Sequence, residues 1–523
     1  MTESLPTRPV PAADSAIAQR VFWRTFVGAM LVKFLLAVIV PFTSDEAYFV
    51  VWGRHLDYGY YDHGAMTGWW LWLMLQIGNS AWLMRLPAVL VSQFVGWALW
   101  RMLRPIDSAK AGWAATLYLV SPASLFSFLI TTDTPLLFFS TLAVLFTWLG
   151  LQRERKRDFF FAGLALGFAF LSKYFAVLLG LSFAALLLFG VRRPRGQALA
   201  ILLSGIVPGV GINVAWNYHH AWVNILFNFY TRQQQSGFSL VSPLLFVAVL
   251  ALLAGPGVIC ALGSRRRHGA LPLREVFPAM QASGTIVFAA VLALPLAVFL
   301  VVSFRHEIGV HWVLSFFPFL AGVLFAWFGA DGLRRMVRPT ALYTAVPAAI
   351  ALSLPFLPLA WARHLNSAFS IVLAARPAGV LAELAPYRPH FLLTTPSYAK
   401  SALFSFYTHE EVPVVGVGSY HARQDDLLTD FRTLDGRDLM IVSDSEKDLV
   451  AAAPWFARIE IKNLVVDDVK FGVLLGTGFN YSVYRTQVLQ TIADRYYPMP
   501  AWLQRFSAPN FFCERYDLQP RAP

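Results

Sequence analysis

The chain has 523 residues, of which 57% are hydrophobic and only 14% are charged. Soluble domains carry about 25% charged residues, so this composition excludes a protein that is soluble throughout and indicates lipid as the solvent for much of the chain. The formal net charge is +12, but the basic residues lie in short clusters between apolar runs. Such clusters set membrane orientation and attract anionic lipid, which argues against nucleic-acid binding.

Long apolar runs fill most of the first 361 residues. Residues 1–19 are polar and rich in Pro and Ala, and we expect a disordered cytoplasmic N-terminus there. The next run lacks a small-residue cleavage pattern and is longer than a signal-peptide core, so it predicts an uncleaved first span. The predicted spans are 21–42, 82–104, 111–130, 134–151, 159–172, 174–190, 197–216, 240–263, 284–303, 312–333 and 339–361. The run 66–78 is too short to cross, and we expect it along the membrane interface.

Basic residues are concentrated in every second loop. The rich loops hold Arg101, Arg104 and Lys110; Arg153, Arg155, Lys156 and Arg157; Arg192, Arg193 and Arg195; Arg265, Arg266 and Arg267; and Arg334, Arg335 and Arg338. The alternate loops hold few, and the turn at 131–133 has none. The positive-inside rule therefore predicts that the rich loops are cytoplasmic and that the chain after the last span lies outside.

The pattern changes after residue 361. Short apolar runs at 391–395, 412–418, 438–442 and 470–479 predict strands, and 397–408 predicts a helix. Strands that alternate with helices indicate an α/β domain over 362–523. The expected domains are thus a disordered segment (1–19), a membrane domain (20–361) with outer loops 43–80 and 217–239, and this C-terminal domain.

Acidic and basic residues gather at the expected outer ends of the spans. Asp45-Glu46 stands out because an acidic pair beside a span is not needed for folding, although a solvated loop is the alternative. The full set is Asp45, Glu46, Asp62, His63, Asp133, Lys173, Arg232, Arg305, His306, Glu307 and His311. A carboxylate can remove a proton from an attacking hydroxyl, which contributes about 10²–10⁴-fold in rate. Cations can hold a phosphate and stabilise it as a leaving group.

Several of these residues also have a structural interpretation. Asp133 precedes Thr134-Pro135 and suits the N-cap of a helix. The structural interpretation of Lys173 is a lysine whose buried aliphatic stem lets the ammonium reach the membrane interface. That of Arg232 is a residue that only keeps its loop in solvent.

The segment 305–312 could hold a metal ion or a substrate, since it contains two histidines and a glutamate. The tyrosines of the first outer loop either pack at the membrane interface or stack against a sugar; they are Tyr48, Tyr58, Tyr60 and Tyr61.

Four segments carry a family resemblance. They are DEAYFVVWGRHLDYGYYDHG (45–64), TTDTPLLFF (131–139), SKYFAVLLG (172–180) and SYAKSALFSFY (397–407) followed by VVGVG (414–418). In this order they resemble GT-C glycosyltransferases, and more narrowly the group of protein O-mannosyltransferases and the lipid A aminoarabinose transferase. The resemblance implies a polytopic α-helical membrane protein of the GT-C type, with about 11–13 transmembrane helices and a C-terminal periplasmic α/β domain, in a bacterial inner membrane.

The resemblance also implies an activity, which is inverting transfer of a sugar from a polyprenyl-phosphate donor on the extracytoplasmic side. The acceptor would be a hydroxyl of lipopolysaccharide, another glycolipid, a glycan or a protein. The implied catalytic residues are Asp45, Glu46 and Asp133; the donor phosphate would be held by Lys173, Arg232, His63 and Arg305; and the substrates would contact Asp62, Tyr61, His306, Glu307 and His311. His63 stands where the aminoarabinose transferase has a lysine that engages the donor phosphate.

Partners expected beyond the substrates are membrane lipids, with no nucleic acid. No cofactor is predicted, and a divalent metal is disfavoured. The alternative function is a transporter or flippase for a lipid-linked sugar, and a third is a non-catalytic lipid-binding scaffold. Transporters place ionisable groups near the membrane midplane and often carry inverted repeats. Here no repeat is visible, and the charges lie at span ends.

Overall fold

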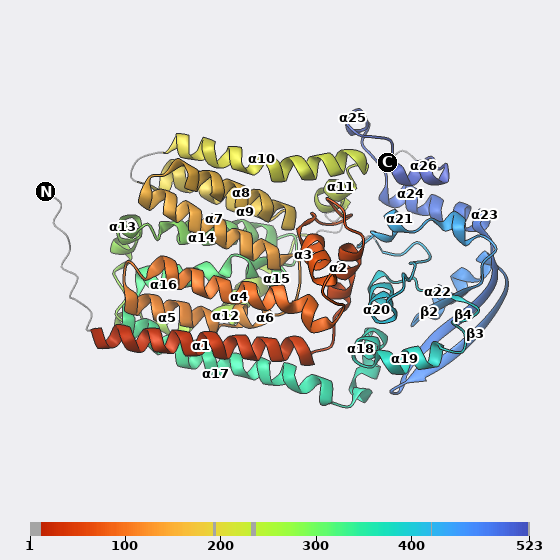
Figure 1. The fold of residues 1–523 in the computed structure, drawn as a ribbon, viewed down its shortest axis with the longest axis horizontal. Helices are drawn as coiled ribbons and strands as arrows, with labels where there is room; N and C mark the ends of the chain where they lie inside the picture. The colour runs from red at the N-terminus through yellow and green to blue at the C-terminus, as the bar shows by residue number, and fades with distance from the viewer. Residues whose placement is uncertain (1–11, 192–194, 232–236, 420, 521–523) are drawn as a thin grey trace. The chain divides into compact units, whose positions relative to one another are not determined.

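The computed structural model describes residues 12–191, 195–231, 237–419 and 421–520. Its contacts divide the chain into two compact units, and Figure 1 labels the helices and strands of both. The helical unit comprises Met1–Ile39, Ser80–Val210 and Ser236–Leu352. The sheet unit comprises Val40–Asn79, Gly211–Gln235 and Ser353–Pro523. The two segments expected as outer loops thus group with the C-terminal part of the chain.

In its described residues the helical unit is built from helices, apart from one isolated β-bridge between Ala270 and Phe328. The helices are α1 (Ala12–Ile39), α4 (Ala81–Leu103), α5 (Ser108–Leu119), α6 (Pro122–Phe126), α7 (Asp133–Arg153), α8 (Lys156–Ser172), α9 (Ala176–Ala185), α10 (Gly196–His219, whose end belongs to the sheet unit), α12 (Val241–Gly263), α13 (Leu273–Ser283), α14 (Ile286–Ser303), α15 (Val310–Leu314), α16 (Leu320–Trp327) and α17 (Ala330–Ser353).

Within the described residues, seven helices are long and apolar enough to cross a membrane, namely α1, α4, α7, α10, α12, α14 and α17. The chain is therefore a multi-pass helical membrane protein, as predicted. Four predicted spans are wrong as uninterrupted helices, namely 111–130, 240–263, 312–333 and 339–361. The run 111–130 breaks at Ser121-Pro122, where α6 begins, and the run 312–333 contains a 3₁₀ turn at Phe317–Phe319. Each of these breaks lies at or next to a proline, which fits the first turn of a helix better than its interior, although α4, α10 and α14 each continue through one. The total of eleven spans stays a prediction.

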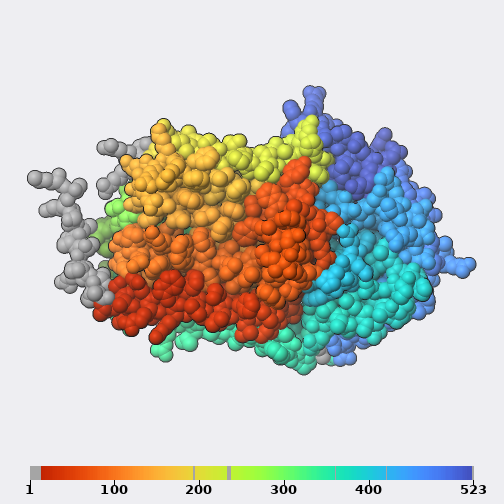
Figure 2. All heavy atoms as spheres, viewed as in Figure 1, coloured from red at the N-terminus to blue at the C-terminus, as the bar shows by residue number. Residues whose placement is uncertain are grey.

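The outer surface of the helical unit is apolar. In α1, side chains such as Val27, Leu31 and Leu35 are exposed, and Figure 2 shows this helix (red) across the visible face. Exposed apolar side chains that run the length of a helix are what a lipid environment requires. The surface thus agrees with a membrane position for this unit.

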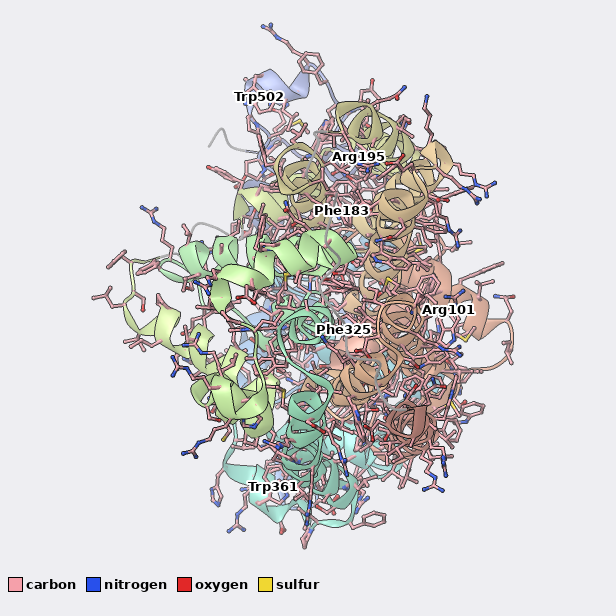
Figure 3. All side chains as sticks on the ribbon, turned by 90° about the vertical axis from the view of Figure 1, so that its left-hand side faces the viewer. Arg101, Phe183, Arg195, Phe325, Trp361 and Trp502 are labelled. Atoms are coloured by element: carbon pink, nitrogen blue, oxygen red, sulfur yellow. The ribbon has the colours of Figure 1, made fainter. Side chains whose placement is uncertain are left out.

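The basic loops meet at one end of the helical unit. Arg195 pairs with Glu154 at 3.1 Å, and Arg335 Nη1 donates to the Arg267 carbonyl at 2.9 Å. Figure 3 looks at this end, where Arg101 and Arg195 are labelled. The basic loops predicted to share one side of the membrane therefore do lie at one end of the helical unit. The assignment of this end to the cytoplasm stays a prediction.

Helices α8 and α10 approach each other through glycines. Gly163 and Gly167 of α8 face Gly205 and Gly209 of α10, so both helices present the small-xxx-small pattern. A Cβ atom on Gly163 would lie 1.9 Å from the Leu202 carbonyl oxygen, and one on Gly209 would lie 2.3 Å from the Gly167 carbonyl oxygen. The two backbones can be this close only because no side chains intervene.

We expect Gly209→Leu to lower the free energy of unfolding by about 1–3 kcal/mol, because the added side chain must push two backbones apart. Thermal unfolding of the purified protein in detergent measures this loss. Gly211→Leu on the same helix is the matched control, since a Cβ there meets no described atom within 4 Å. Equal losses in the two variants would contradict the close packing of α8 and α10.

The sheet unit combines short helices with one sheet. Its helices are α2 (Ser44–Arg54), α3 (Met66–Leu75), α11 (Val223–Phe229), α18 (Ala368–Ala375), α19 (Pro377–Leu384), α20 (Tyr398–Thr408), α21 (Asp425–Leu428), α22 (Glu446–Ala452), α23 (Tyr481–Tyr484), α24 (Gln490–Tyr496), α25 (Ala501–Gln504) and α26 (Phe511–Tyr516), and its strands are β1 (Leu392–Thr394), β2 (Leu439–Ser443), β3 (Phe456–Val466) and β4 (Val469–Phe479).

The sheet has the strand order β1-β2-β4-β3, in which β1 and β2 are parallel and the other pairs are antiparallel. Strands β3 and β4 form a hairpin whose two turn residues, Asp467 and Asp468, both have positive φ, as a type I′ turn requires. Three predicted strands and the helix at 397–408 are confirmed. The strand predicted at 412–418 is wrong, because Gly416 (φ 87°) and Gly418 (φ 63°) turn the chain. Only Val414 pairs there, in a single bridge with Thr395.

Candidate functional site

Helix α2 begins with a capping box that involves Glu46. The Thr43 hydroxyl oxygen accepts from the Glu46 backbone N–H at 3.3 Å, and Glu46 Oε2 accepts from the Thr43 backbone N–H at 3.1 Å. Glu46 is 1% exposed. Its carboxylate therefore satisfies backbone donors that the first turn of a helix would otherwise leave unpaired.

Asp45 has a different environment from its neighbour. Its side chain is exposed, in contrast to the buried Glu46. The pKa of Asp45 is raised above its ordinary value, first because the surrounding protein desolvates part of its carboxylate, and then because the charges of Asp62 and Glu46 oppose its ionisation. His63 acts in the opposite direction. Asp45 is thus an accessible carboxylate of increased basicity, which suits proton removal.

The segment that carries Asp62 and His63 is held by two asparagines of α11. Asn224 Nδ2 donates to the carbonyls of Tyr60 (2.6 Å) and His63 (2.9 Å), and Asn228 Nδ2 donates to the carbonyl of Asp62 (2.9 Å). These bonds fix the backbone on both sides of the Asp62 side chain. Helix α11 therefore positions the charges that act on Asp45.

Asp62 and His63 lie close to each other in this fixed segment. Asp62 Oδ1 accepts from the Tyr48 hydroxyl at 3.2 Å, and Asp62 Oδ2 lies 3.5 Å from His63 Nδ1. His63 Nδ1 is buried and makes no hydrogen bond among the described residues. This nitrogen is available to a substrate group or to a rearranged Asp62.

Most tyrosines of this region serve packing. Tyr60 and Tyr61 are at most 1% exposed, and the Tyr60 ring stacks on Trp52 at 4.8 Å between centroids. Tyr61 packs against Phe227 and its backbone N–H donates to Gln424. Only Tyr58 of the four is exposed. Burial of the Tyr61 ring favours the packing interpretation over its expected contact with a substrate.

A second group of charges lies in the helical unit, at the opposite end of α7 and α8 from Arg153 and Lys156. Lys173 Nζ donates to Asp133 Oδ2 at 2.7 Å, and the Ser315 hydroxyl donates to Asp133 Oδ1 at 2.9 Å. Lys173 and Asp133 are 9% and 7% exposed. Asp133, Ser315 and His311 line one cavity of about 210 Å³. The pair is therefore buried but borders a space that a ligand could enter.

These contacts decide between the structural and the functional interpretation of both Asp133 and Lys173. The N-cap of α7 is Thr132, and the Asp133 carboxylate bonds to Lys173 and Ser315, so the capping interpretation of Asp133 is wrong. Lys173 does not extend toward solvent but turns inward to Asp133, with its ammonium 5.0 Å from the centroid of Phe175. A lysine that only reached for the interface would not be buried against a carboxylate.

The remaining expected residues are less organised. Arg305 and Glu307 are exposed and His306 is half-buried, whereas His311 reaches the cavity beside Asp133. Arg232 lies outside the described residues. Across the described ranges, no three His, Cys, Asp or Glu side chains converge in a way that could hold a metal ion. The roles of these residues stay predictions.

Four functional features were not predicted. The capping box was readable, since Thr43 and Glu46 have the spacing of that motif. Ser315 and the α11 asparagines gave no local signal, because they are single polar residues far along the chain from their partners. The same holds for Asp425 and Tyr398, which line a cavity of the sheet unit.

A family model described as dolichyl-phosphate-mannose-protein mannosyltransferase matches residues 62–216. This range includes Asp62, His63, Asp133 and Lys173. The lipid A galacturonosyltransferase RgtD of Rhizobium johnstonii is 30% identical over 186 residues, which cover 34% of this chain and 39% of that protein. The match thus spans less than half of that relative.

Two solved structures are similar to the chain over most of its length. They are ArnT from Cupriavidus metallidurans in the apo state, with a TM-score of 0.60, and the same protein bound to undecaprenyl phosphate, with a TM-score of 0.58. Both are 17% identical, and each match covers 86% of this chain and 97% of the other. At this identity the likeness shows a shared fold.

Proposed function

We propose that this chain is a GT-C glycosyltransferase, which transfers a sugar from a polyprenyl-phosphate donor to a hydroxyl of a glycolipid. The name of RgtD specifies lipid A, and one ArnT structure holds undecaprenyl phosphate. We therefore take lipid A as the acceptor and undecaprenyl phosphate as the carrier. The reaction would occur at the periplasmic face of a bacterial inner membrane, with the basic end of the helical unit in the cytoplasm.

The environment of the Asp45 carboxylate is the observation that carries this proposal. Asp45 is an exposed carboxylate with a raised pKa, and the adjacent Glu46 alone closes the capping box. In the proposed step, Asp45 takes the proton of the acceptor hydroxyl as its oxygen forms a bond to the anomeric carbon. The bond from that carbon to the phosphate oxygen breaks, and polyprenyl phosphate leaves with the bonding electrons. A single displacement inverts the anomeric configuration.

Lys173 is the proposed contact for the leaving phosphate. The Lys173 ammonium is positively charged and is held in place by its bond to Asp133. A positive charge held in place before the reaction stabilises the negative charge that develops on the leaving oxygen. Asp133 then acts by orienting Lys173, and Arg305, His63 and His311 are further candidates for phosphate or sugar contacts.

The test reconstitutes the purified protein in proteoliposomes with an undecaprenyl-phosphate sugar labelled in the sugar, together with lipid A. We expect the label to appear on lipid A with release of undecaprenyl phosphate. Mass spectrometry of the product identifies the transferred unit. Movement of the intact labelled donor between leaflets without any transfer would overturn the proposal in favour of a flippase.

The charge of Asp62 is expected to set the pH dependence of transfer. Because the pKa of Asp45 is raised, the base form is lost as pH falls through a value above that of an ordinary aspartate. Asp62→Asn removes one cause of the shift, so the acidic limb of kcat/KM should move to lower pH. His63→Ala removes the opposing contribution and should move the limb to higher pH. A limb that is unchanged in both variants would exclude Asp45 as the titrating group.

A further inference from the structure

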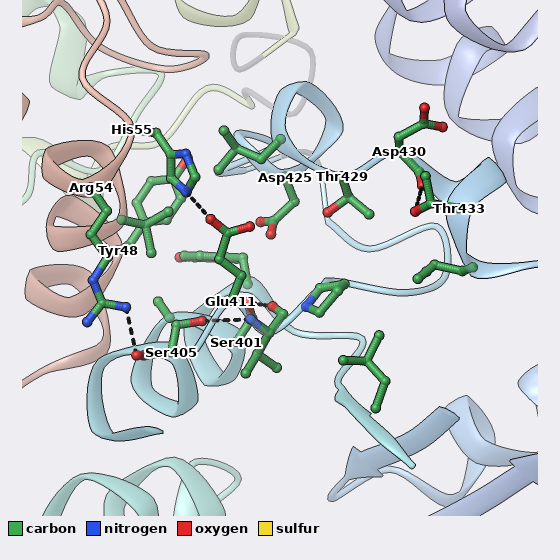
Figure 4. A pocket seen from close by; sticks show the side chains of 18 of the residues that line it. Tyr48, Arg54, His55, Ser401, Ser405, Glu411, Asp425, Thr429, Asp430 and Thr433 are labelled. Carbon is green, nitrogen blue, oxygen red and sulfur yellow. Dashed lines mark hydrogen bonds and ion pairs between the residues drawn. The ribbon is translucent and has the colours of Figure 1, made fainter. Parts of the chain in front are cut away.

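A cavity of about 250 Å³ lies within the sheet unit, between α2, α20 and the chain around α21. Figure 4 shows it from close by, with Tyr48, Arg54 and His55 on α2 and the segment after it, and with Glu411 and Asp425 opposite. Its lining comes from two parts of the chain that are far apart in sequence, residues 48–55 and 392–437. Nothing in the proposed step at Asp45 and Lys173 uses this cavity.

Charges of both signs line the cavity. His55 Nε2 lies 2.8 Å from Glu411 Oε1, and Arg54 Nη1 donates to the Ser405 carbonyl at 2.8 Å. Arg437 and Asp430 also belong to the lining. A cavity for a phosphate would be mainly basic and one for a cation mainly acidic. Alternating donors and acceptors instead match a ligand with many hydroxyl groups, each of which both donates and accepts.

The Asp425 carboxylate is one of the polar groups that line the cavity. Burial raises its pKa to about 7, with the Asp426 charge as the next cause and Arg423 opposing. Near neutral pH it can therefore either donate to or accept from a hydroxyl. Asp425 and Tyr398 also line a second cavity of about 530 Å³, so a ligand longer than one sugar unit has room to continue.

The cavity adjoins the acidic residues around Asp45. The Tyr48 ring borders the cavity, and its hydroxyl donates to Asp62. The Tyr398 ring lies 5.4 Å from that of Tyr48, and the charges of Asp45 and Asp62 contribute, after burial, to raising the pKa of Tyr398 to about 12. The two rings thus line the cavity and also interact with the nearby carboxylates. Aromatic rings of this kind also provide apolar faces for a sugar.

We propose that this cavity binds a saccharide unit of the acceptor and thereby presents an acceptor hydroxyl to Asp45. This inference rests on the proposed function for the identity of the acceptor. It adds to that function a binding site, of which Tyr48, Tyr398, His55, Glu411 and Asp425 are the contacts.

The test measures binding rather than transfer. The probes are the deacylated saccharide of lipid A, which isolates the sugar from the acyl chains, and undecaprenyl phosphate as the donor-side probe. Calorimetry is done on the full-length protein in nanodiscs, with Asp425→Ala and His55→Ala compared with Asp467→Ala. Asp467 lies in the β3–β4 turn and is not part of the cavity.

We expect Asp425→Ala and His55→Ala each to weaken saccharide binding about ten-fold, as for the loss of one hydrogen bond to a charged group, without any change for undecaprenyl phosphate. Asp467→Ala should change neither. Unchanged saccharide binding in both cavity variants, or no binding by the natural protein, would overturn the inference, as would a loss confined to undecaprenyl phosphate. If the natural protein binds the saccharide through this cavity but transfers no sugar, the proposed function fails while the binding site stands.

Discussion

Replacement of Asp45 by asparagine is expected to lower the rate of sugar transfer by about 10²–10⁴-fold, the usual contribution of a positioned general base. Asparagine has the size of aspartate but cannot take up the proton of the acceptor hydroxyl. Because the Asp45 side chain is exposed and closes no capping bond, the variant should unfold at the same temperature as the natural protein. The measurement is transfer from an undecaprenyl-phosphate sugar to lipid A, with thermal unfolding recorded on the same preparation.

Glu46→Gln separates the two adjacent acidic residues. A glutamine oxygen can still accept from the Thr43 backbone, so the capping box survives and the loss of stability should stay below about 1 kcal/mol. We expect this variant to keep most of the transfer activity. Its loss of charge should also lower the pKa of Asp45, because Glu46 is one cause of the upward shift. If Glu46→Gln loses activity and Asp45→Asn keeps it, Glu46 is the base and the proposed assignment is wrong.

The sequence could predict these two residues as a pair but could not assign their roles. Both are acidic and both follow the first span, so residue type and position in the sequence do not distinguish the catalytic residue from the capping one. Their roles diverge because Thr43 is the N-cap of α2, which places the Glu46 side chain back on the helix end and leaves Asp45 facing outward. A one-residue difference along a helix is a rotation of about 100°, enough to separate a buried side chain from an exposed one.

Apolar runs predicted the helices well where they were unbroken, and poorly where a proline or glycine interrupted them. The runs at 82–104 and 134–151 are single helices, α4 and α7. The run 312–333 looked similar in hydropathy, but Pro318 and the extended Phe328 divide it between three helices. Hydropathy reports the solvent that a segment needs, not whether its backbone hydrogen bonds continue.

Strand prediction from apolar runs has the same limit as helix prediction. Strands β2 and β4 were predictable because they are apolar and buried along most of their length. Strand β3 was missed because charged residues alternate with isoleucines on this edge of the sheet, and most of its residues are exposed. The segment 412–418 was overpredicted because its valines suit a strand while its glycines adopt φ values that a strand does not allow.

Loss of the Lys173 charge is expected to abolish most donor binding. This effect on binding must be distinguished from the loss of stability that the same change causes. Lys173→Ala leaves the buried Asp133 carboxylate without its cation, although the Ser315 hydroxyl still donates to it at 2.9 Å, and an unpaired buried charge costs about 3–5 kcal/mol. This single variant should therefore both unfold at a lower temperature and bind undecaprenyl phosphate weakly. On its own it cannot separate a structural ion pair from a phosphate contact.

The double variant Asp133→Asn/Lys173→Met makes that separation. It removes both charges at nearly constant volume, and replacement of a buried pair by neutral groups is often neutral or stabilising. We expect near-natural thermal unfolding together with a loss of undecaprenyl phosphate binding of at least about ten-fold, since a charge-assisted hydrogen bond is worth about 1.5–3 kcal/mol. Ser315→Ala is the matched control, because it removes one bond to Asp133 but keeps both charges. Full donor binding in a stable double variant would show that the pair only holds α7 and α8 together, and the leaving phosphate would then need another cation.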